Sequence, residues 1–228
     1  MQARDRLIVA ADLSEAGEIL RLADELHGLA GAIKVGLQAF TANGPSIVRE
    51  LVQRGHRVFL DLKLHDIPHT VRHAVREAES LGAAMLTVHA AGGEAMLRAA
   101  RSERMLVLAV TVLTSLGDAD LERIGVPGGA TATVVGLASL ARSAGIGGVV
   151  ASPQEIAAIR EACGAGMTIV TPGIRPEGSA AEDQRRTLTP GEAVRAGADY
   201  IVVGRPITGA GDRGEAARRI VDEMEKAG

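Results

Sequence analysis

The chain has 228 residues, of which 46% are hydrophobic, and a formal net charge of −3 at pH 7. A chain of this length can bury a large core, and its near-neutral charge without a basic face argues against a nucleic-acid partner. The apolar segments are too short for a signal peptide or a membrane span, and the lone Cys163 has no disulfide partner, so we expect a cytoplasmic protein.

Short apolar runs rich in Val, Ile and Leu recur along the chain and predict strands. These runs cover residues 7–12, 32–36, 57–64, 84–90, 105–113, 147–152, 168–174 and 200–206. Stretches with helical spacing lie between them, at residues 14–27, 45–54, 68–81, 132–144, 153–162 and 212–226. Ser14, Ser152 and Asp212 stand where helix N-caps are expected.

Continuous apolar strands that alternate with helices predict a parallel sheet covered by helices. Eight such units in a chain of this length predict an α/β fold, a single-domain (β/α)8 TIM barrel that spans residues 1–228. An open doubly wound sheet is the alternative, although no Gly-x-Gly-x-x-Gly follows the first strand, where the sequence reads Ala-Ala-Asp12-Leu-Ser-Glu. In a barrel, the functional site is expected at the carboxyl ends of the strands.

Polar residues and glycines stand at these predicted strand ends. In chain order they are Asp12, Lys34, Asp61, Lys63, His89, Thr114, Pro172, Gly173, Arg175, Gly204 and Arg205. Barrels of this kind usually hold phosphate in the loops after strands seven and eight, and here each of these loops offers glycine and one arginine. The sequence therefore predicts a phosphorylated ligand.

A long polar segment without helical spacing follows strand seven, at about residues 174–190. Loops of this length within a compact domain are usually functional or disordered. We expect this loop to close over the phosphate and exclude water, and a mobile surface insertion is the alternative.

Lysine is rare in this chain: of 25 basic residues, only Lys34, Lys63 and Lys226 are lysines. Lysine can give up a proton under conditions where the guanidinium of arginine stays charged. Lys226 lies in the polar carboxyl-terminal tail, where solvation explains it. The other two lysines stand at predicted strand ends and are candidates for chemistry.

The segment around strand three concentrates charged residues. Asp61 and Lys63 are two residues apart in a predicted strand, so both side chains are expected to face the barrel interior, and Asp66 follows in the turn before the next helix. A structural salt bridge or a helix cap could explain each charge singly. Four charged groups buried together, with Lys34 and Asp12 at neighbouring strand ends, point instead to function, because burial of charge costs free energy.

The segment Asp61-x-Lys63-x-x-Asp66-Ile67-Pro68-x-Thr70 resembles the signature of the orotidine 5'-monophosphate decarboxylase family. The other matching segments are Ala-Asp12, Ile-Lys34-Val-Gly, Leu-Thr114-Ser, Thr-Pro172-Gly-Ile-Arg175-Pro, Asp-Gln184-Arg-Arg and Val-Gly204-Arg205-Pro-Ile. Together these segments span nearly the whole chain, and they occur in the same order as in the family. The resemblance implies decarboxylation of orotidine 5'-monophosphate to uridine 5'-monophosphate in pyrimidine biosynthesis, without a cofactor or a metal.

The resemblance also implies roles for individual residues. The expected catalytic residues are Lys63, Asp61, Asp66 and Lys34. The expected substrate-binding residues are Asp12 and Lys34 at the ribose, Thr114 at the pyrimidine edge, Gln184 between base and phosphate, Arg175, Gly204 and Arg205 at the phosphate, together with Ile67, Thr70 and Pro172. A homodimer is implied, because in the family the second aspartate of the motif, here Asp66, completes the neighbouring site, and Thr70 is expected to accompany it.

Several alternatives stay open at this point. A metal-dependent sugar-phosphate decarboxylase or aldolase shares the Asp-x-Lys-x-x-Asp core, but such relatives carry a glutamate near the end of strand two, where this chain has Lys34. A Schiff-base aldolase needs a lysine with a depressed pKa, which flanking carboxylates oppose. A non-catalytic phosphate-binding barrel has no use for the Lys63 cluster. His69 and His73 have helical spacing, but they lack the glutamate of a His-Glu-x-x-His zinc motif.

Overall fold

The computed structural model describes residues 1–176 and 188–227, and within these residues eight parallel strands form one closed barrel. The strands pair in chain order, and β1 pairs with β8 as well as with β2, so the sheet is closed and not open. The predicted (β/α)8 TIM barrel is confirmed. The strands are β1 (Leu7–Ala10), β2 (Ala32–Gly36), β3 (Val58–Leu64), β4 (Met85–His89), β5 (Leu106–Val110), β6 (Gly148–Val150), β7 (Thr168–Thr171) and β8 (Tyr200–Val203).

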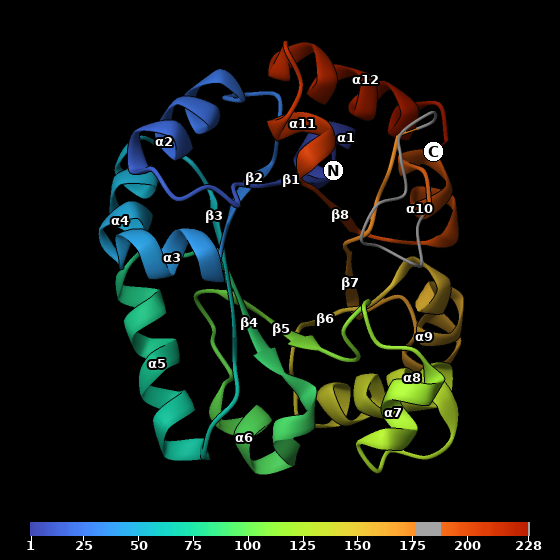
Figure 1. Ribbon diagram of the computed structural model, residues 1–228. Coiled ribbons are helices and arrows are strands. Elements are labelled where there is room, and N and C mark those ends of the chain that lie inside the picture. Colours follow the sequence, from blue (N-terminus) through green and yellow to red (C-terminus); the bar gives the residue numbers. More distant parts are fainter. Residues whose placement is uncertain (177–187, 228) are drawn as a thin grey trace.

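The helices form a ring around the strands (Figure 1). The helices of eight or more residues are α2 (Ala16–Glu25), α4 (Ser46–Gln53), α5 (Pro68–Ser80), α8 (Gly129–Ser143), α9 (Ile156–Cys163) and α12 (Arg213–Glu225). The shorter ones are α1 (Ala3–Arg6), α3 (Leu37–Asn43), η1 (Ala90–Gly92), α6 (Gly93–Ala99), α7 (Asp118–Arg123), η2 (Pro153–Glu155), α10 (Pro190–Ala196) and α11 (Arg205–Thr208). Within residues 1–176 and 188–227, none of these helices combines the length and the apolar character needed to cross a membrane.

Two apolar layers hold the barrel together. The inner layer fills the barrel and consists of Ile8, Ala10, Ala32, Phe59, Met85, Leu108, Val170 and Val202. Alternate residues of the same strands, such as Leu60 and Leu86, belong to the larger layer beneath the helices. This alternation explains the continuous apolar runs in the sequence, because both faces of each strand are buried. The filled interior also confines open space to the ends of the strands.

Most strands end earlier than the sequence predicts. β1 ends at Ala10 and β5 ends at Val110, although the apolar runs continue beyond both. The chain keeps one further sheet-like hydrogen bond at each place, from Ala11 N to Lys34 O at 3.0 Å and from Thr111 N to Val150 O at 3.2 Å. Ala11 and Val112, beyond the two strand ends, are nevertheless buried, so packing accounts for their apolar character.

The predicted N-caps have different outcomes. The side chains of Ser152 and Asp212 accept hydrogen bonds from the Gln154 and Glu215 amides, as expected of N-caps. Ser14 was the wrong residue, because α2 begins after Glu15, whose side chain makes no capping bond. The Ser14 hydroxyl instead accepts a hydrogen bond from Gln38 Nε2 at 3.1 Å, which ties the β1 loop to α3.

Candidate active site

A cavity of about 300 Å³ opens at the carboxyl ends of the strands. Its apolar wall includes Phe59 and Val202 from the inner layer, together with Val110 and Val150. Its polar lining consists of Asp12, Lys34, Asp61, Lys63, Thr114, Arg175, Arg205 and Thr208. The cavity therefore combines an apolar wall that suits a ring with charged groups of both signs.

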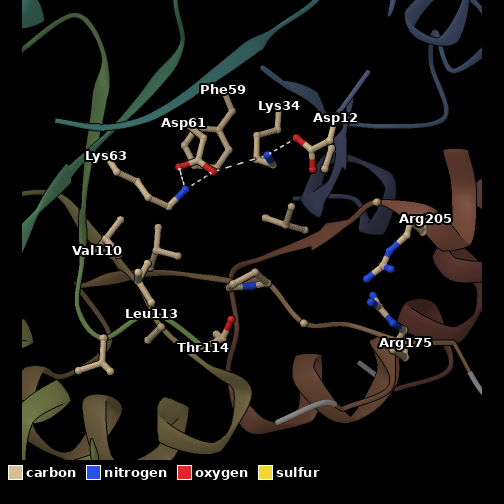
Figure 2. A pocket seen from close by; sticks show the side chains of 18 of the residues that line it. Asp12, Lys34, Phe59, Asp61, Lys63, Val110, Leu113, Thr114, Arg175 and Arg205 are labelled. Carbon is tan, nitrogen blue, oxygen red and sulfur yellow. Dashed lines mark hydrogen bonds and ion pairs between the residues drawn. The ribbon is translucent and has the colours of Figure 1, made fainter. Parts of the chain in front are cut away.

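Four charged side chains form a continuous chain of ion pairs along one wall (Figure 2). Lys34 Nζ lies 3.0 Å from Asp12 Oδ1 and 3.5 Å from Asp61 Oδ2. Lys63 Nζ lies 2.9 Å from Asp61 Oδ1 and 2.8 Å from Asp61 Oδ2. These residues come from β2, β3 and the loop after β1, so the barrel brings together charges that are far apart in the sequence.

The cluster fixes the protonation state of its central carboxylate. Burial disfavours the charged form of Asp61, but the ammonium groups of Lys34 and Lys63 outweigh this effect and lower the pKa of Asp61 below its ordinary value of 3.8. The exposed fractions of the side chains are 13% for Asp61 and 11% for Lys34. Asp61 is therefore a carboxylate near neutral pH, held between two cations in a place with little water.

The strand that carries this cluster is irregular. β3 pairs with β4 through Leu60 and Leu86, and again through Leu64 and Val88, with a register shift between the two pairs. Lys63 lies within the shift and has a φ of 52°, the one positive φ of a non-glycine residue in the described ranges. Asp61 and Lys63 both line the cavity, as the two-residue spacing predicted, but they do so in a bulge and not in a regularly paired strand.

The opposite wall of the cavity carries two arginines whose side chains approach one another (Figure 2). Arg175 follows β7, and Arg205 begins α11 directly after Gly204. Pro172 and Gly204 also line the cavity. The strand-seven and strand-eight residues expected at a phosphate thus lie on one side of the cavity, across from Lys63.

The ends of the predicted closing loop pair with each other. Ile174 and Leu188 form a parallel bridge, and Arg175 N donates to Leu188 O at 3.0 Å. Gln184, expected between base and phosphate, lies outside the described residues, as does most of the loop.

Three residues of the motif lie outside this cavity. Asp66, Ile67 and Thr70 are exposed at the start of α5, and Ile67 has 65% of its surface exposed. Asp66 Oδ1 accepts a hydrogen bond from the Ile67 amide at 2.7 Å, so this carboxylate does not contact Lys63 within the chain.

Several residues of the site carry no clear signal in the sequence. Phe59, Leu113 and Thr208 line the cavity. Gly36 lies where a Cβ atom would come within 2.8 Å of Lys34 Nζ and 2.9 Å of Asp12 Oδ1, so its lack of a side chain makes room for that ion pair. Its position two residues after the strand-two lysine, on the same face of the strand, was the available signal.

The histidines form pairs and not a metal cluster. The ring centroids are 4.5 Å apart for His69 and His73 and 5.5 Å apart for His65 and His89. In the part of the chain that the structure describes, no group of three or more His, Cys, Asp or Glu side chains is arranged to hold a metal ion.

Comparison with known proteins agrees with this geometry. A family model described as orotidine 5'-phosphate decarboxylase / HUMPS family matches residues 5–220. Proteins named orotidine 5'-phosphate decarboxylase are similar to the chain: the one from Alkalilimnicola ehrlichii is 52% identical, with 96% of each chain covered, and the one from Sodalis glossinidius is 47% identical, covering all of this chain and 93% of its own length.

A solved structure supports the same conclusion. The crystal structure of orotidine 5'-phosphate decarboxylase from Lactobacillus acidophilus superposes with a TM-score of 0.85 at 35% identity, over 96% of this chain and 98% of that one. The family match, the similar relatives and the shared fold all extend over nearly the full length. The chain therefore belongs to the orotidine 5'-phosphate decarboxylase / HUMPS family.

Proposed function

We propose that this protein decarboxylates orotidine 5'-monophosphate to uridine 5'-monophosphate in pyrimidine biosynthesis, with residues 1–228 acting as one catalytic domain. The observation that carries the proposal is the position of the Lys63 ammonium: it is held by both oxygens of Asp61 within the cavity, across from Arg175 and Arg205. The named relatives of similar length support the same reaction.

Decarboxylation of this substrate requires a cation next to C6 of the pyrimidine ring. When the bond between C6 and the carboxylate breaks, CO2 leaves and the electron pair stays on C6, in the plane of the ring, where the π-system does not delocalise it. The Lys63 ammonium stabilises this charge and then transfers a proton to C6, and water reprotonates the amine. This route uses no cofactor and no metal. Both oxygens of Asp61 accept hydrogen bonds from the Lys63 ammonium and so fix its position in the cavity.

The remaining residues of the cavity bind the substrate in this proposal. Asp12 and Lys34 hold the ribose hydroxyls, Thr114 contacts the pyrimidine edge, and Pro172 packs in the same wall. Arg175 and Arg205, with the Gly204 backbone, hold the phosphate, and Gln184 bridges base and phosphate when the loop at about residues 174–190 closes. Binding energy at the phosphate then orients the base against Lys63.

A homodimer would complete the site. Asp66, Ile67 and Thr70 are exposed and do not line their own cavity, which supports a role at the ribose and the lysine of a neighbouring subunit. We place this dimer in the cytoplasm. Sedimentation of the purified protein gives its mass, and mixing an inactive Lys63→Ala protein with an inactive Asp66→Ala protein tests the sharing: mixed dimers regain activity only if each site takes Asp66 from the other subunit.

A second candidate arises because the family description also names HUMPS. The alternative function is that of a metal-dependent sugar-phosphate decarboxylase or aldolase. Such enzymes are expected to carry a glutamate at the end of β2, where this chain has Lys34. The Lys34 ammonium lies 3.5 Å from Asp61, so it would repel a divalent cation at the same carboxylate. We therefore favour decarboxylation of the nucleotide. A non-catalytic phosphate-binding barrel would not account for the Lys63 cluster.

The deciding experiment follows the absorbance of orotidine 5'-monophosphate after addition of chelator-treated protein. We expect rapid loss of substrate with the wild-type protein and none with Lys63→Ala. Lys226→Ala is the matched control, because that lysine is exposed at the end of α12, and it should keep wild-type activity. A wild-type protein that leaves the nucleotide intact, or that needs added divalent metal, would move the assignment to the sugar-phosphate branch.

A further inference from the structure

We propose that Thr87, on β4, is a positioning residue that holds the β3 bulge in the conformation that presents Lys63 to the substrate. Thr87 does not line the cavity, and its side chain is fully buried next to the catalytic pair. The proposal rests on the decarboxylase function proposed above, since it gives Thr87 a role in placing the lysine that protonates C6.

The register of the sheet explains why such a residue is needed. Between the paired positions Leu60–Leu86 and Leu64–Val88, β3 has three residues, 61 to 63, whereas β4 has only Thr87. Regular pairing is therefore lost along the stretch of β3 that carries both Asp61 and Lys63. Backbone groups in such a bulge need partners other than the neighbouring strand.

The Thr87 hydroxyl supplies the missing partner. The Lys63 amide donates to Thr87 Oγ1 at 2.9 Å, and Thr87 Oγ1 donates to Asp61 Oδ1 at 2.9 Å. The direction of both bonds follows from chemistry: an amide N–H can only donate, and an ionised carboxylate can only accept. One hydroxyl thus uses its proton and a lone pair to connect the backbone of the lysine with the side chain of the aspartate.

These two bonds fix the parts of the pair that the chemistry depends on. The bond to the Lys63 amide holds that residue at a φ of 52°, a conformation that side chains other than glycine rarely adopt. The bond to Oδ1 fixes the rotation of the Asp61 carboxylate, whose two oxygens receive the Lys63 ammonium. Thr87 therefore acts on the position of the ammonium from both ends of the lysine.

A hydroxyl on a short side chain is required at this position. Valine has nearly the same shape, but it leaves the Lys63 amide and one side of Asp61 Oδ1 without this partner in a buried place. Serine keeps the hydroxyl and loses only a methyl group. The pair of variants Thr87→Val and Thr87→Ser thus separates the hydrogen bonds from the packing of the side chain.

The test compares steady-state kinetics on orotidine 5'-monophosphate. For Thr87→Val we expect kcat to fall on the order of 100-fold, as small misplacements of a reacting group do, with little change in KM. Thr87→Ser should restore most of kcat. Thr111→Val is the control: this threonine is also buried, directly after β5, and its hydroxyl donates to Val150 O at 3.0 Å, but it does not contact the cluster. It should keep wild-type kcat even where it lowers stability.

Specific outcomes would overturn the proposal. They are wild-type kcat in a folded Thr87→Val protein, an equal loss in Thr87→Val and Thr87→Ser, or a rise in KM without a fall in kcat. A second measurement needs no variant and no substrate: amide hydrogen exchange at Lys63 in the wild-type protein should be strongly slowed, and exchange at the rate of an unprotected amide would contradict the bond to Thr87. If the wild-type protein does not turn over the nucleotide, the proposed function fails, and the exchange measurement still tests the hydrogen bond.

Discussion

Lys34 and Lys63 share one carboxylate oxygen: their ammonium nitrogens lie 3.5 and 2.8 Å from Asp61 Oδ2. Two cations this close repel one another, and the carboxylate between them offsets the repulsion. Asp12 continues the chain on the far side of Lys34, so the cluster of two lysines and two aspartates is neutral as a whole. Removal of any member changes the charge that the substrate meets.

Asp61→Asn should reduce kcat about 100- to 1,000-fold, because it removes a preorganised charge from the site while it keeps the shape of the side chain. The reason is that Lys63 loses the carboxylate that orients its ammonium through two hydrogen bonds. Initial rates at saturating substrate measure the effect. Asp24→Asn is the control, since Asp24 also forms an ion pair, with Arg54, but lies on an exposed surface. Equal rates for Asp61→Asn and wild type would contradict the role of Asp61.

The pH dependence of stability should also report on Asp61. Its pKa is lowered in the folded protein, so the folded state holds its proton more weakly than the unfolded state does. The resulting stabilisation is complete above the ordinary value of 3.8 and is lost as the pH falls below it, through the folded pKa. Urea unfolding at pH 7 and at pH 3 should show a smaller loss of free energy for Asp61→Asn than for wild type.

The carboxylates of Asp24 and Glu192 also have lowered pKa values, and each contributes a loss of the same sign to both proteins. The comparison therefore rests on the difference between wild type and Asp61→Asn and not on the wild-type curve alone. Identical losses in the two proteins would show that the field of the two lysines does not act on Asp61 as described.

Gly36→Ala should weaken substrate binding with little effect on folding. The added methyl group would come within 2.8 Å of Lys34 Nζ and 2.9 Å of Asp12 Oδ1, so the ion pair proposed to hold the ribose has to separate. The backbone at Gly36 has φ −91°, which alanine adopts freely. We expect KM to rise about tenfold, the equivalent of one weakened hydrogen bond to a charged group.

The control for this change is Gly136→Ala in the middle of α8, where no atom lies within 4 Å of the new Cβ. It should leave KM unchanged and raise the free energy of unfolding by about 0.5–1 kcal/mol, because alanine is the better helix former. A Gly36→Ala protein with wild-type KM would show that the Asp12–Lys34 pair does not contact the substrate.

Arg205→Ala should raise KM about 10- to 100-fold, as expected when a charged hydrogen-bond partner worth about 1.5–3 kcal/mol is removed from a phosphate. The loss should depend on the phosphate: turnover of the nucleoside orotidine, which lacks it, should be the same in variant and wild type. Arg219→Ala, an exposed arginine on α12 paired with Glu215, is the matched control. An equal loss on orotidine would place Arg205 at another part of the substrate.

The sequence by itself determined the repeat of strands and helices and the charged residues that the cavity uses. Apolar runs of strand length predict buried strands because both faces of each strand are covered, and this holds for β1 to β8. Asp61, Lys63 and Lys34 were identifiable because charge in such a run is costly unless it has a partner or a purpose. The family signature then added the reaction.

Only the tertiary structure decided how these parts meet. Closure of the barrel depends on pairing between β1 and β8, which no local pattern encodes. The bulge at Lys63 arises because β3 has more residues than β4 between the same two paired positions. Thr87 contacts Asp61 and Lys63, which are distant from it in the sequence. Gly36 matters because the side chains of Lys34 and Asp12 lie where its Cβ atom would be. These features follow from register and close packing, which are properties of the assembled barrel and not of any single segment of the chain.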